Sequence, residues 1–295
     1  MSRFSSLAKL LTVASCLVCV HTLAQAQMPQ QQPQAKSFKL GSLDIVALHD
    51  AQFVQPNDSK IFGLDHSPAE VAALLSAAGA PTDTVTLSVD ALLVRSGKHI
   101  VLIDTGVGGA LQGSLEKAGV KPDQIDEILL THTHPDHIGG LVIDGKLAFP
   151  NATIRMSEAE WKFAKTNEKI APIVKLITNK VKTFTPGGSV APGITSVSLP
   201  GHTPGHVGYR ITSGKERLFD IGDTVHSSII SLAKPDWAVS FDGDKPEAEA
   251  NRSKTLSSLV KSHELIFAPH FPFPGVGYIQ AEGDHFKWDP TEKAD

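Results

Sequence analysis

The feature that most constrains this chain is the run HTHPDH at residues 132–137, which places three imidazoles and one carboxylate within six residues. It directly follows a short apolar segment with the character of a buried strand. Side chains two residues apart in an extended chain point the same way, so His132 and His134 can reach one point together. The proline then turns the chain, and Asp136 and His137 face a second point. Imidazole and carboxylate ligands suit Zn²⁺ and similar ions, so the run predicts a metal site.

Further histidines and carboxylates follow other predicted strands. The run PGHTPGH at residues 200–206 follows one strand, Asp223 follows a second and His270 follows a third. Polar residues at the ends of successive apolar strands are typical of a functional rim on a rigid scaffold. A single histidine in such a place is more often structural or solvated. The indication of a metal centre therefore comes from the four clusters together.

The first 26 residues have the features of a secretory signal peptide. Arg3 and Lys9 precede an apolar stretch, and Ala24-Gln25-Ala26 fits the small-x-small rule for cleavage. The apolar stretch of about 14 residues is short for the roughly 20 that span a bilayer. Lipidation at Cys16 is the other interpretation, because the residues before it loosely fit a bacterial lipobox. We predict an exported protein, periplasmic or secreted, with no membrane span in its mature form.

Export would remove both cysteines, Cys16 and Cys19, so the mature chain could form neither a disulfide nor a cysteine-ligated metal site. The Gln/Pro-rich residues 27–36 predict a disordered linker. Residues 37–295 are predicted to form one domain. The formal net charge is −4 without a long run of one sign, so the sequence indicates no nucleic-acid partner.

The predicted elements alternate in a way that indicates two sheets with helices outside. Ser67 is the expected N-cap of a helix, with Glu70 completing a capping box. Strands are predicted at residues 38–40, 43–48, 85–94, 99–103, 127–130, 152–156, 194–199, 207–212, 217–221, 265–268, 278–280 and 286–288, and helices at 67–77, 111–118, 157–165, 170–181 and 245–262. This order predicts an α/β (α+β) protein, with two sheets packed face to face in a four-layer αββα sandwich.

These motifs together resemble the metallo-β-lactamase superfamily over residues 38–288. The resemblance is carried by the HxHxDH run, the GHTPGH run, the D-x-G-D segment that ends at Asp223, and the late histidine His270. Segments 104–106, 149–152, 201–206, 273–275 and 281–283 more narrowly resemble the methyl parathion hydrolase and lactonase-like branch. The resemblance implies the metallo-β-lactamase fold.

The resemblance also implies two divalent metal ions, with Zn²⁺ expected and Mn²⁺, Fe²⁺ or Co²⁺ suited to the same ligands. It assigns one ion to His132, His134 and His202, the second to Asp136, His137 and His270, and a bridging role to Asp223. Asp104 would orient a ligand histidine through its other ring nitrogen. His206 matches no ligand position and is expected to be structural or to support a ligand.

The activity implied is hydrolysis of a small lactone, aryl ester or phosphotriester by a metal-bridging hydroxide, because two metals lower the pKa of a shared water towards about 7. Asp136 is the expected proton shuttle. His226 stands near the place where acyl-homoserine lactonases of the superfamily have a tyrosine. It would hydrogen-bond to the substrate carbonyl or act as a general acid. The equal alternative is a side chain that points to solvent.

Trp161, Phe271 and Phe273 are expected to line an apolar substrate cleft, whereas Phe163 is expected to pack in the core. The stretch from Asp104 to His132 is shorter than in methyl parathion hydrolase, and it has Leu111 near an aromatic pocket position of that enzyme. A lactonase or arylesterase with weak phosphotriesterase activity is therefore favoured.

Two other functions stay open. A true β-lactamase is disfavoured because those enzymes usually lack a bridging carboxylate where this chain has Asp223. A non-catalytic periplasmic metal-binding or redox protein is the alternative from a different class. Flavodiiron-type members replace one histidine with a carboxylate and add a flavin domain, and nuclease members need a basic groove. A homodimer is expected from the resemblance alone.

Overall fold

The structure is a computed structural model that describes residues 31–291, and these form one compact unit. The predicted signal peptide, the lipidation alternative at Cys16 and residues 27–30 of the predicted linker lie outside the described residues. Across residues 31–291, no helix combines the length and the apolar character that crossing a membrane would require.

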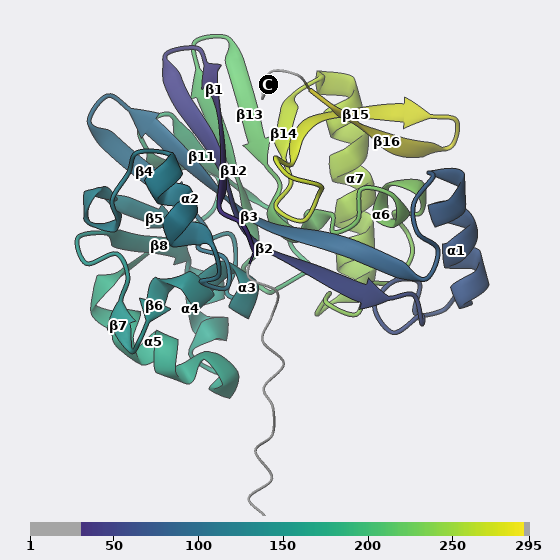
Figure 1. Cartoon of the computed structure of the whole chain (residues 1–295), viewed down its shortest axis with the longest axis horizontal. Coiled ribbons are helices and arrows are strands. Elements are labelled where there is room, and N and C mark those ends of the chain that lie inside the picture. Colours follow the sequence, from purple (N-terminus) through teal and green to yellow (C-terminus); the bar gives the residue numbers. More distant parts are fainter. Residues whose placement is uncertain (1–30, 292–295) are drawn as a thin grey trace, which may run out of the picture. The chain divides into compact units, whose positions relative to one another are not determined.

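Two seven-stranded sheets form the centre of the fold (Figure 1). The first sheet has the order β1 (Gln34–Leu40), β2 (Leu43–Pro56), β3 (Thr84–Ser96), β4 (His99–Ile103), β5 (Glu127–Leu129), β8 (Thr153–Ser157) and β9 (Val181–Phe184). The second has the order β10 (Ser189–Ala191), β11 (Ile194–Ser198), β12 (Val207–Ser213), β13 (Glu216–Asp220), β14 (Leu265–Phe267), β15 (Val276–Glu282) and β16 (His285–Pro290). A small ribbon pairs β6 (Val142–Ile143) with β7 (Lys146–Leu147).

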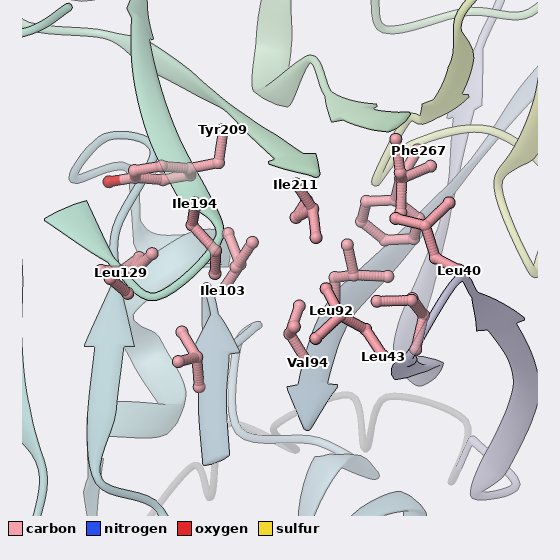
Figure 2. Close-up of a cluster of buried hydrophobic side chains, with 14 of the residues drawn as sticks. Leu40, Leu43, Leu92, Val94, Ile103, Leu129, Ile194, Tyr209, Ile211 and Phe267 are labelled. Atoms are coloured by element: carbon pink, nitrogen blue, oxygen red, sulfur yellow. The ribbon is translucent and has the colours of Figure 1, made fainter. Parts of the chain in front are cut away.

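The two sheets pack through a shared apolar core. Leu92 and Ile103 of the first sheet and Ile211 and Phe267 of the second belong to one cluster and are each at most 1% exposed. Figure 2 shows these side chains filling the space between strands of the two sheets. Burying each such side chain stabilises the fold by about 1.5–3 kcal/mol. Tyr209 joins the same cluster and donates a hydrogen bond to the carbonyl of Leu130 across it (2.6 Å).

Helices cover the outer faces of both sheets. On the first sheet, α2 (Leu111–Lys117), α4 (Glu158–Ala164) and α5 (Ala171–Ile177) enclose a second apolar cluster. On the second sheet, Leu256 and Leu259 of α7 (Lys245–Ser262) pack against Ile266 of β14. Figure 1 places α2, α4 and α5 on the side opposite α7. The predicted αββα sandwich is thus confirmed.

Local sequence signals explain where the helices begin. In α1 (Pro68–Ala77), Ser67 accepts from the backbone of Glu70, and the Glu70 carboxylate accepts from the backbone of Ser67, so the predicted capping box is present. Asp244 caps α7 by accepting from Glu247 N. Two further short helices, α3 (Pro135–Ile138) and α6 (Ile230–Ala233), lie in loops beside the predicted ligands.

Besides the short elements that were not predicted, such as β6, β7 and β10, the structure differs from the sequence prediction at the ends of three elements. β2 continues past residue 48 to Pro56, through a bulge between His49 and Ala51 where buried polar residues interrupt the apolar pattern. The helix predicted to reach residue 181 ends at Ile177. A 3-10 turn follows at Thr178–Lys180, and β9 begins at Val181. β1 takes in the last three residues of the predicted linker, because Ala35 pairs with β2 and packs on the core.

Candidate functional site

The predicted ligands lie in loops that follow strands of both sheets. The run 132–137 follows β5, and its last part forms the single turn of α3. His202 lies between β11 and β12, Asp223 follows β13, and His270 follows β14. Since β5 belongs to one sheet and the other three strands to the second, the sandwich brings these loops together at one edge.

Four of these residues form the first group of possible metal ligands. The Nε2 atom of His202 lies 3.1 Å from Nε2 of His132 and 2.8 Å from Nδ1 of His134. Asp223 Oδ2 lies 3.3 Å from Nε2 of His202 and 3.7 Å from Nε2 of His132. One ligand atom from each of the four lies within 4.8 Å of all the others.

Asp136, His137 and His270 form a second group with the same mutual spacing. Asp223 contacts this group as well, with Oδ1 3.1 Å from Nε2 of His137 and Oδ2 3.2 Å from Nε2 of His270. Asp136 Oδ2 is 3.7 Å from the same atom of His270. The carboxylate of Asp223 therefore lies between the two groups, where the resemblance placed a bridging ligand.

The chemistry of this donor set fits two divalent cations. His202, His137 and His270 each use Nδ1 in a hydrogen bond to an oxygen: of Asp242 (3.0 Å), of Asp104 (2.7 Å) and of the Ser88 carbonyl (2.7 Å). In the neutral imidazoles the proton is then on Nδ1, so each Nε2 presents a lone pair to the centre. Converging lone pairs and carboxylate oxygens repel one another unless a cation lies among them.

A buried atom without a partner supports the same conclusion. Asp223 Oδ1 is buried and has no hydrogen-bond partner among the described residues. Its neighbour at 3.1 Å is Nε2 of His137, which presents a lone pair when the imidazole is neutral. A buried carboxylate oxygen that faces a lone pair is unfavourable, so this pair of atoms fits a cation between them.

The electrostatics differ between the two groups. Burial and the neighbouring histidines lower the pKa of His132 well below its ordinary value, and burial likewise lowers that of His202. Burial also opposes charge on His137 and His270, but the carboxylate of Asp223 overcomes it. The pKa of His137 is raised well above its ordinary value and that of His270 to about 9. Although burial opposes its ionisation, these histidines hold the pKa of Asp223 well below its usual range.

Asp104 lies against His137, at hydrogen-bond distance from its outer ring nitrogen. Its carboxylate accepts from Nδ1 of His137 and from the backbone and hydroxyl of Thr131, at 2.7–2.8 Å. The backbone of Asp104 has φ 58°, in the left-handed region where aspartate and asparagine are tolerated better than most residues. The sharp turn after β4 is what directs this carboxylate toward the ligands.

Two buried side chains that the sequence did not single out support His202. Asp242 accepts from Nδ1 of His202 with one oxygen and from Nη2 of Arg252 with the other (2.5 Å). Arg252 projects from α7 and is 0% exposed. Burial opposes ionisation of Asp242, yet its bond to His202 and the charge of Arg252 bring its pKa down to about 2. Neither residue lies in a recognisable motif, so the sequence carried no local signal for them.

Glu160 of α4 joins the two histidine-bearing loops and was also missed. Its carboxylate accepts from the backbone and hydroxyl of Thr133 (2.8 and 2.6 Å), from the hydroxyl of Thr203 (2.6 Å) and from Gly205 N (3.2 Å). A Cβ on Gly205 would lie 2.0 Å from Glu160 N, so only glycine allows this approach. The threonines between the histidines of both motifs thus bind a common carboxylate.

His206 occupies a supporting position and none of the ligand positions. Its Nδ1 donates to the carbonyl of Leu199 (2.7 Å), so its Nε2 accepts from the backbone of Asp223 (3.0 Å). Both ring nitrogens are used within the protein. His206 therefore fixes the loop that carries Asp223.

His226 is buried at 1% exposure, so the alternative of a side chain in solvent is wrong. Its Nε2 lies 3.3 Å from Asp223 Oδ2, and its ring stacks nearly parallel to that of His270 at 5.7 Å. Neither ring nitrogen has a hydrogen-bond partner among the described residues. The imidazole thus presents a polar group beside the centre that is free to bind a substrate atom.

The metal centre opens into a cavity of about 490 Å³. The side next to the centre is lined by His134, Pro135, Asp136, Asp223, His226 and His270. The remaining walls are mainly apolar and come from the β2–β3 hairpin and from two loops: Phe53, Gln55, Leu87, Val107, Ser240 and Phe241.

The prediction that Trp161, Phe271 and Phe273 line the substrate cavity was wrong. Trp161 packs on the cluster under the first sheet, and Phe271 is fully buried in the cluster beneath α7. Phe273 packs at the edge of the inter-sheet core, with its ring against His49. These aromatic residues are close to the motifs in sequence, but their side chains do not line the cavity. Phe163 is half-buried and does not line it either.

Comparison with known proteins assigns the family. Residues 84–270 match the model of the metallo-beta-lactamase superfamily, and the chain belongs to this superfamily. The structure is similar to that of AidC, a dizinc quorum-quenching lactonase with bound product, at a TM-score of 0.84 and 32% identity. That match covers 88% of this chain and 98% of AidC. AbOPH, a hydrolase in the beta lactamase superfamily, gives a TM-score of 0.81 and 31% identity, covering 89% and 99%.

Curated relatives give the same picture over shorter matches. An N-acyl homoserine lactonase of Bacillus cereus is 30% identical over 152 residues, or 52% of this chain and 55% of that enzyme, so this match spans about half of each. An N-acyl homoserine lactonase of Bacillus thuringiensis is 26% identical over 236 residues, covering 70% of this chain and 88% of the enzyme. With its His/Asp cluster for two metal ions, the chain is a metal-dependent hydrolase of the superfamily.

Proposed function

We propose that this protein hydrolyses lactones that carry an apolar substituent. The observation that supports this most is the direct opening of the donor set into a cavity whose other walls are mainly apolar, from Phe53 to Phe241. Such a cavity binds an acyl or alkyl chain while the ring carbonyl lies over the centre. The lactonase activities named for AidC and the Bacillus enzymes agree with this assignment.

The seven residues from His132 to His270 would hold two divalent ions, which lower the pKa of a shared water towards about 7 and polarise a carbonyl. Asp223 keeps both groups of ligands in one arrangement because its oxygens face His137 and His270 as well as His202. Asp136 lines the cavity with its side chain 30% exposed. As the hydroxide oxygen adds to the lactone carbonyl carbon, Asp136 can accept the remaining proton of that oxygen and pass it to the alkoxide released when the ring C–O bond breaks.

His226 is the residue we assign to the substrate oxygen. A neutral imidazole carries one N–H, and here Nε2 lies 3.3 Å from Asp223 Oδ2 while neither ring nitrogen forms a hydrogen bond with the described residues. A hydrogen bond from this N–H to the carbonyl oxygen strengthens as negative charge develops there. Aryl esters would fit the same arrangement, whereas phosphotriesters are expected to be weaker substrates.

The test is turnover of a panel by the metal-loaded protein: dihydrocoumarin, an acyl-homoserine lactone, p-nitrophenyl acetate, methyl paraoxon and a cephalosporin. Lactone turnover that vanishes in His134→Ala and falls in His226→Phe is the expected result. A His226→Gln variant, which restores an N–H donor, should recover part of the loss. Turnover of the cephalosporin alone would replace the lactonase assignment with β-lactamase. If two metals bind and no substrate is turned over, the non-catalytic metal-binding alternative gains support.

We also propose that the chain is exported, on the strength of its N-terminal sequence alone. N-terminal sequencing of the protein from a periplasmic or culture fraction should then begin at Gln27. A mature protein that still carries Met1, or a lipid on Cys16, would contradict this cleavage site. Dimer formation is a separate proposal, for which sedimentation of the purified protein is the direct measurement.

A further inference from the structure

Arg252 has a set of contacts that the proposed reaction does not yet use. It is fully buried, and its guanidinium makes four polar contacts with other parts of the chain. Its Nε donates to the carbonyl of Thr224 (3.0 Å), and its Nη2 pairs with Asp242 (2.5 Å). Its Nη1 donates to the carbonyls of Pro235 (2.9 Å) and Trp237 (3.3 Å). A planar guanidinium can hold all of these at once, whereas a lysine ammonium is a single point of charge.

Two of these contacts, with Asp242 and with Thr224, connect Arg252 to the metal centre. Asp242 bonds to Nδ1 of His202, and Nε2 of His202 faces the first group of ligands. Thr224 directly follows Asp223, so the bond to its carbonyl holds the segment of the bridging carboxylate. Outer partners of this kind set the orientation and basicity of the ligands they contact.

The contacts with the carbonyls of Pro235 and Trp237 connect Arg252 to the wall of the cavity. The loop from Pro235 to Asp242 carries Ser240 and Phe241, which line the cavity. Arg252 holds the start of this loop through two carbonyls and its end through the Asp242 carboxylate. The Phe241 ring lies 5.4 Å from the ring of His226. A loop held at both ends keeps this wall at a fixed distance from the centre.

We propose that Arg252 is a positioning residue with two separable effects on the reaction: it orients ligand His202 through Asp242, and it holds the Ser240–Phe241 wall against the substrate through the carbonyls of Pro235 and Trp237. The effect on substrate binding rests on the proposed lactonase function. The effects on metal binding and on the loop do not, so they can be tested even if that function fails.

Two variants separate the two effects. Asp242→Asn replaces one of the two carboxylate oxygens with an amide nitrogen, which cannot accept from Nδ1 of His202. The remaining amide oxygen still accepts from Nη2 of Arg252, so the end of the loop stays held, and the guanidinium keeps the carbonyls of Pro235 and Trp237. Arg252→Lys keeps a cation for Asp242 but cannot reach both carbonyls. Arg210→Lys is the matched control, because Arg210, which lies on β12, pairs with Glu264 and has no hydrogen bond to the loop or the ligands. Removing the Arg252 charge altogether would leave Asp242 buried and unpaired, so Lys is the safer replacement.

The readouts are metal affinity by chelator competition, KM and kcat on a lactone, and emission of Trp237. Trp237 stacks on His66 at 3.9 Å and reports on the loop, in a background in which Trp161 and Trp288 are both replaced by Phe. We expect Asp242→Asn to weaken metal binding about 10–100-fold with emission and KM close to those of the parent. We expect Arg252→Lys to raise KM roughly tenfold and to shift emission to longer wavelength, with metal affinity changed less than in Asp242→Asn.

Two results would overturn the proposal. If Arg252→Lys lowers only the melting temperature, as a purely structural residue would, the positioning role is absent. If both variants lose metal affinity and substrate binding in parallel, the two effects are not separable. Absence of lactone turnover in the parent protein would count against the proposed function instead, and the metal and emission measurements would still decide the role of Arg252.

Discussion

The metal centre and the cavity wall formed by the β2–β3 hairpin are built in opposite ways. At the centre, His137, His202 and His270 each have an outer hydrogen-bond partner, and Asp223 is held through His206. The β2–β3 wall presents apolar surfaces such as Phe53 and Leu87, which are positioned by packing of the hairpin. This difference teaches that hydrogen bonds fix the positions of the metal ligands, and with them the chemistry. The choice of substrate at the β2–β3 wall depends on apolar contacts, which other apolar side chains could replace.

The largest expected effect comes from the bridging residue. Asp223→Ala removes a carboxylate that contacts histidines of both groups. We expect kcat to fall by about three orders of magnitude or more, since the metal contribution is worth several kcal/mol and each 1.36 kcal/mol is tenfold. Metal analysis should show less than two ions per chain. An exposed aspartate, Asp123, changed to Ala is the control, and full activity in Asp223→Ala would end the bridging assignment.

A smaller effect is expected from the outer partner of His137. Asp104→Asn keeps a residue that tolerates φ 58°, but it replaces the carboxylate that accepts from His137 and Thr131. Metal affinity should fall about 10–100-fold, as measured by competition with a chelator. Asp104→Ala should lose more, because alanine adopts this backbone conformation less readily. An affinity equal to that of the parent would mean that the hydrogen bonds at the centre matter less than this comparison requires.

The two groups of ligands should also differ in their dependence on pH. In the metal-free protein His270 has a pKa of about 9 and that of His137 is raised, so both carry protons at neutral pH and must lose them to bind a metal. The affinity of this group should therefore rise with pH, about tenfold per unit for each proton displaced, until the pH reaches these pKa values. The pKa values of His132 and His202 are lowered, so their group should show little such dependence. Calorimetry in buffers of different ionisation enthalpy counts the protons, and equal release from both groups would contradict the difference.

The smallest effect is expected at the wall. Phe53→Ala should raise KM for an acyl-substituted lactone roughly tenfold and leave kcat within about twofold, because burying a phenyl side chain is worth about 1.5–3 kcal/mol and 1.4 kcal/mol is tenfold. An unsubstituted lactone should be unaffected. Val54→Ala is the matched control, since Val54 adjoins Phe53 in β2 but is 58% exposed. A large drop in kcat would show that the wall takes part in the chemistry.

The sequence predicted the centre much better than the walls. His132, His202, Asp223 and His270 each follow an apolar strand, and strand ends of a sandwich converge, so local pattern and resemblance were sufficient. The walls come from distant positions that approach only after the β2–β3 hairpin has formed. Their pattern in sequence resembles that of ordinary half-buried strands.

Choosing aromatics beside the motifs failed for a physical reason. Phe271 follows His270 directly, but the chain turns here, with Phe271 N donating to the carbonyl of Ala268 (3.2 Å), and the ring packs in the cluster under α7. Asp242 and Glu160 could not be identified because the atoms they serve are far away in sequence. Their roles depend on packing of α4 and α7 against the loops, which no local pattern encodes.

The spread of the ligands along the chain also sets when the protein can acquire its metals. The second group needs His270, which follows β14, and β14 pairs in parallel with β13 only after all of α7 has been made. A growing chain thus exposes the HTHPDH run long before the site is complete and can hold a metal there only loosely. Stable loading must await synthesis and folding of the segment that carries His270, so the metal taken up is the one available where that segment folds.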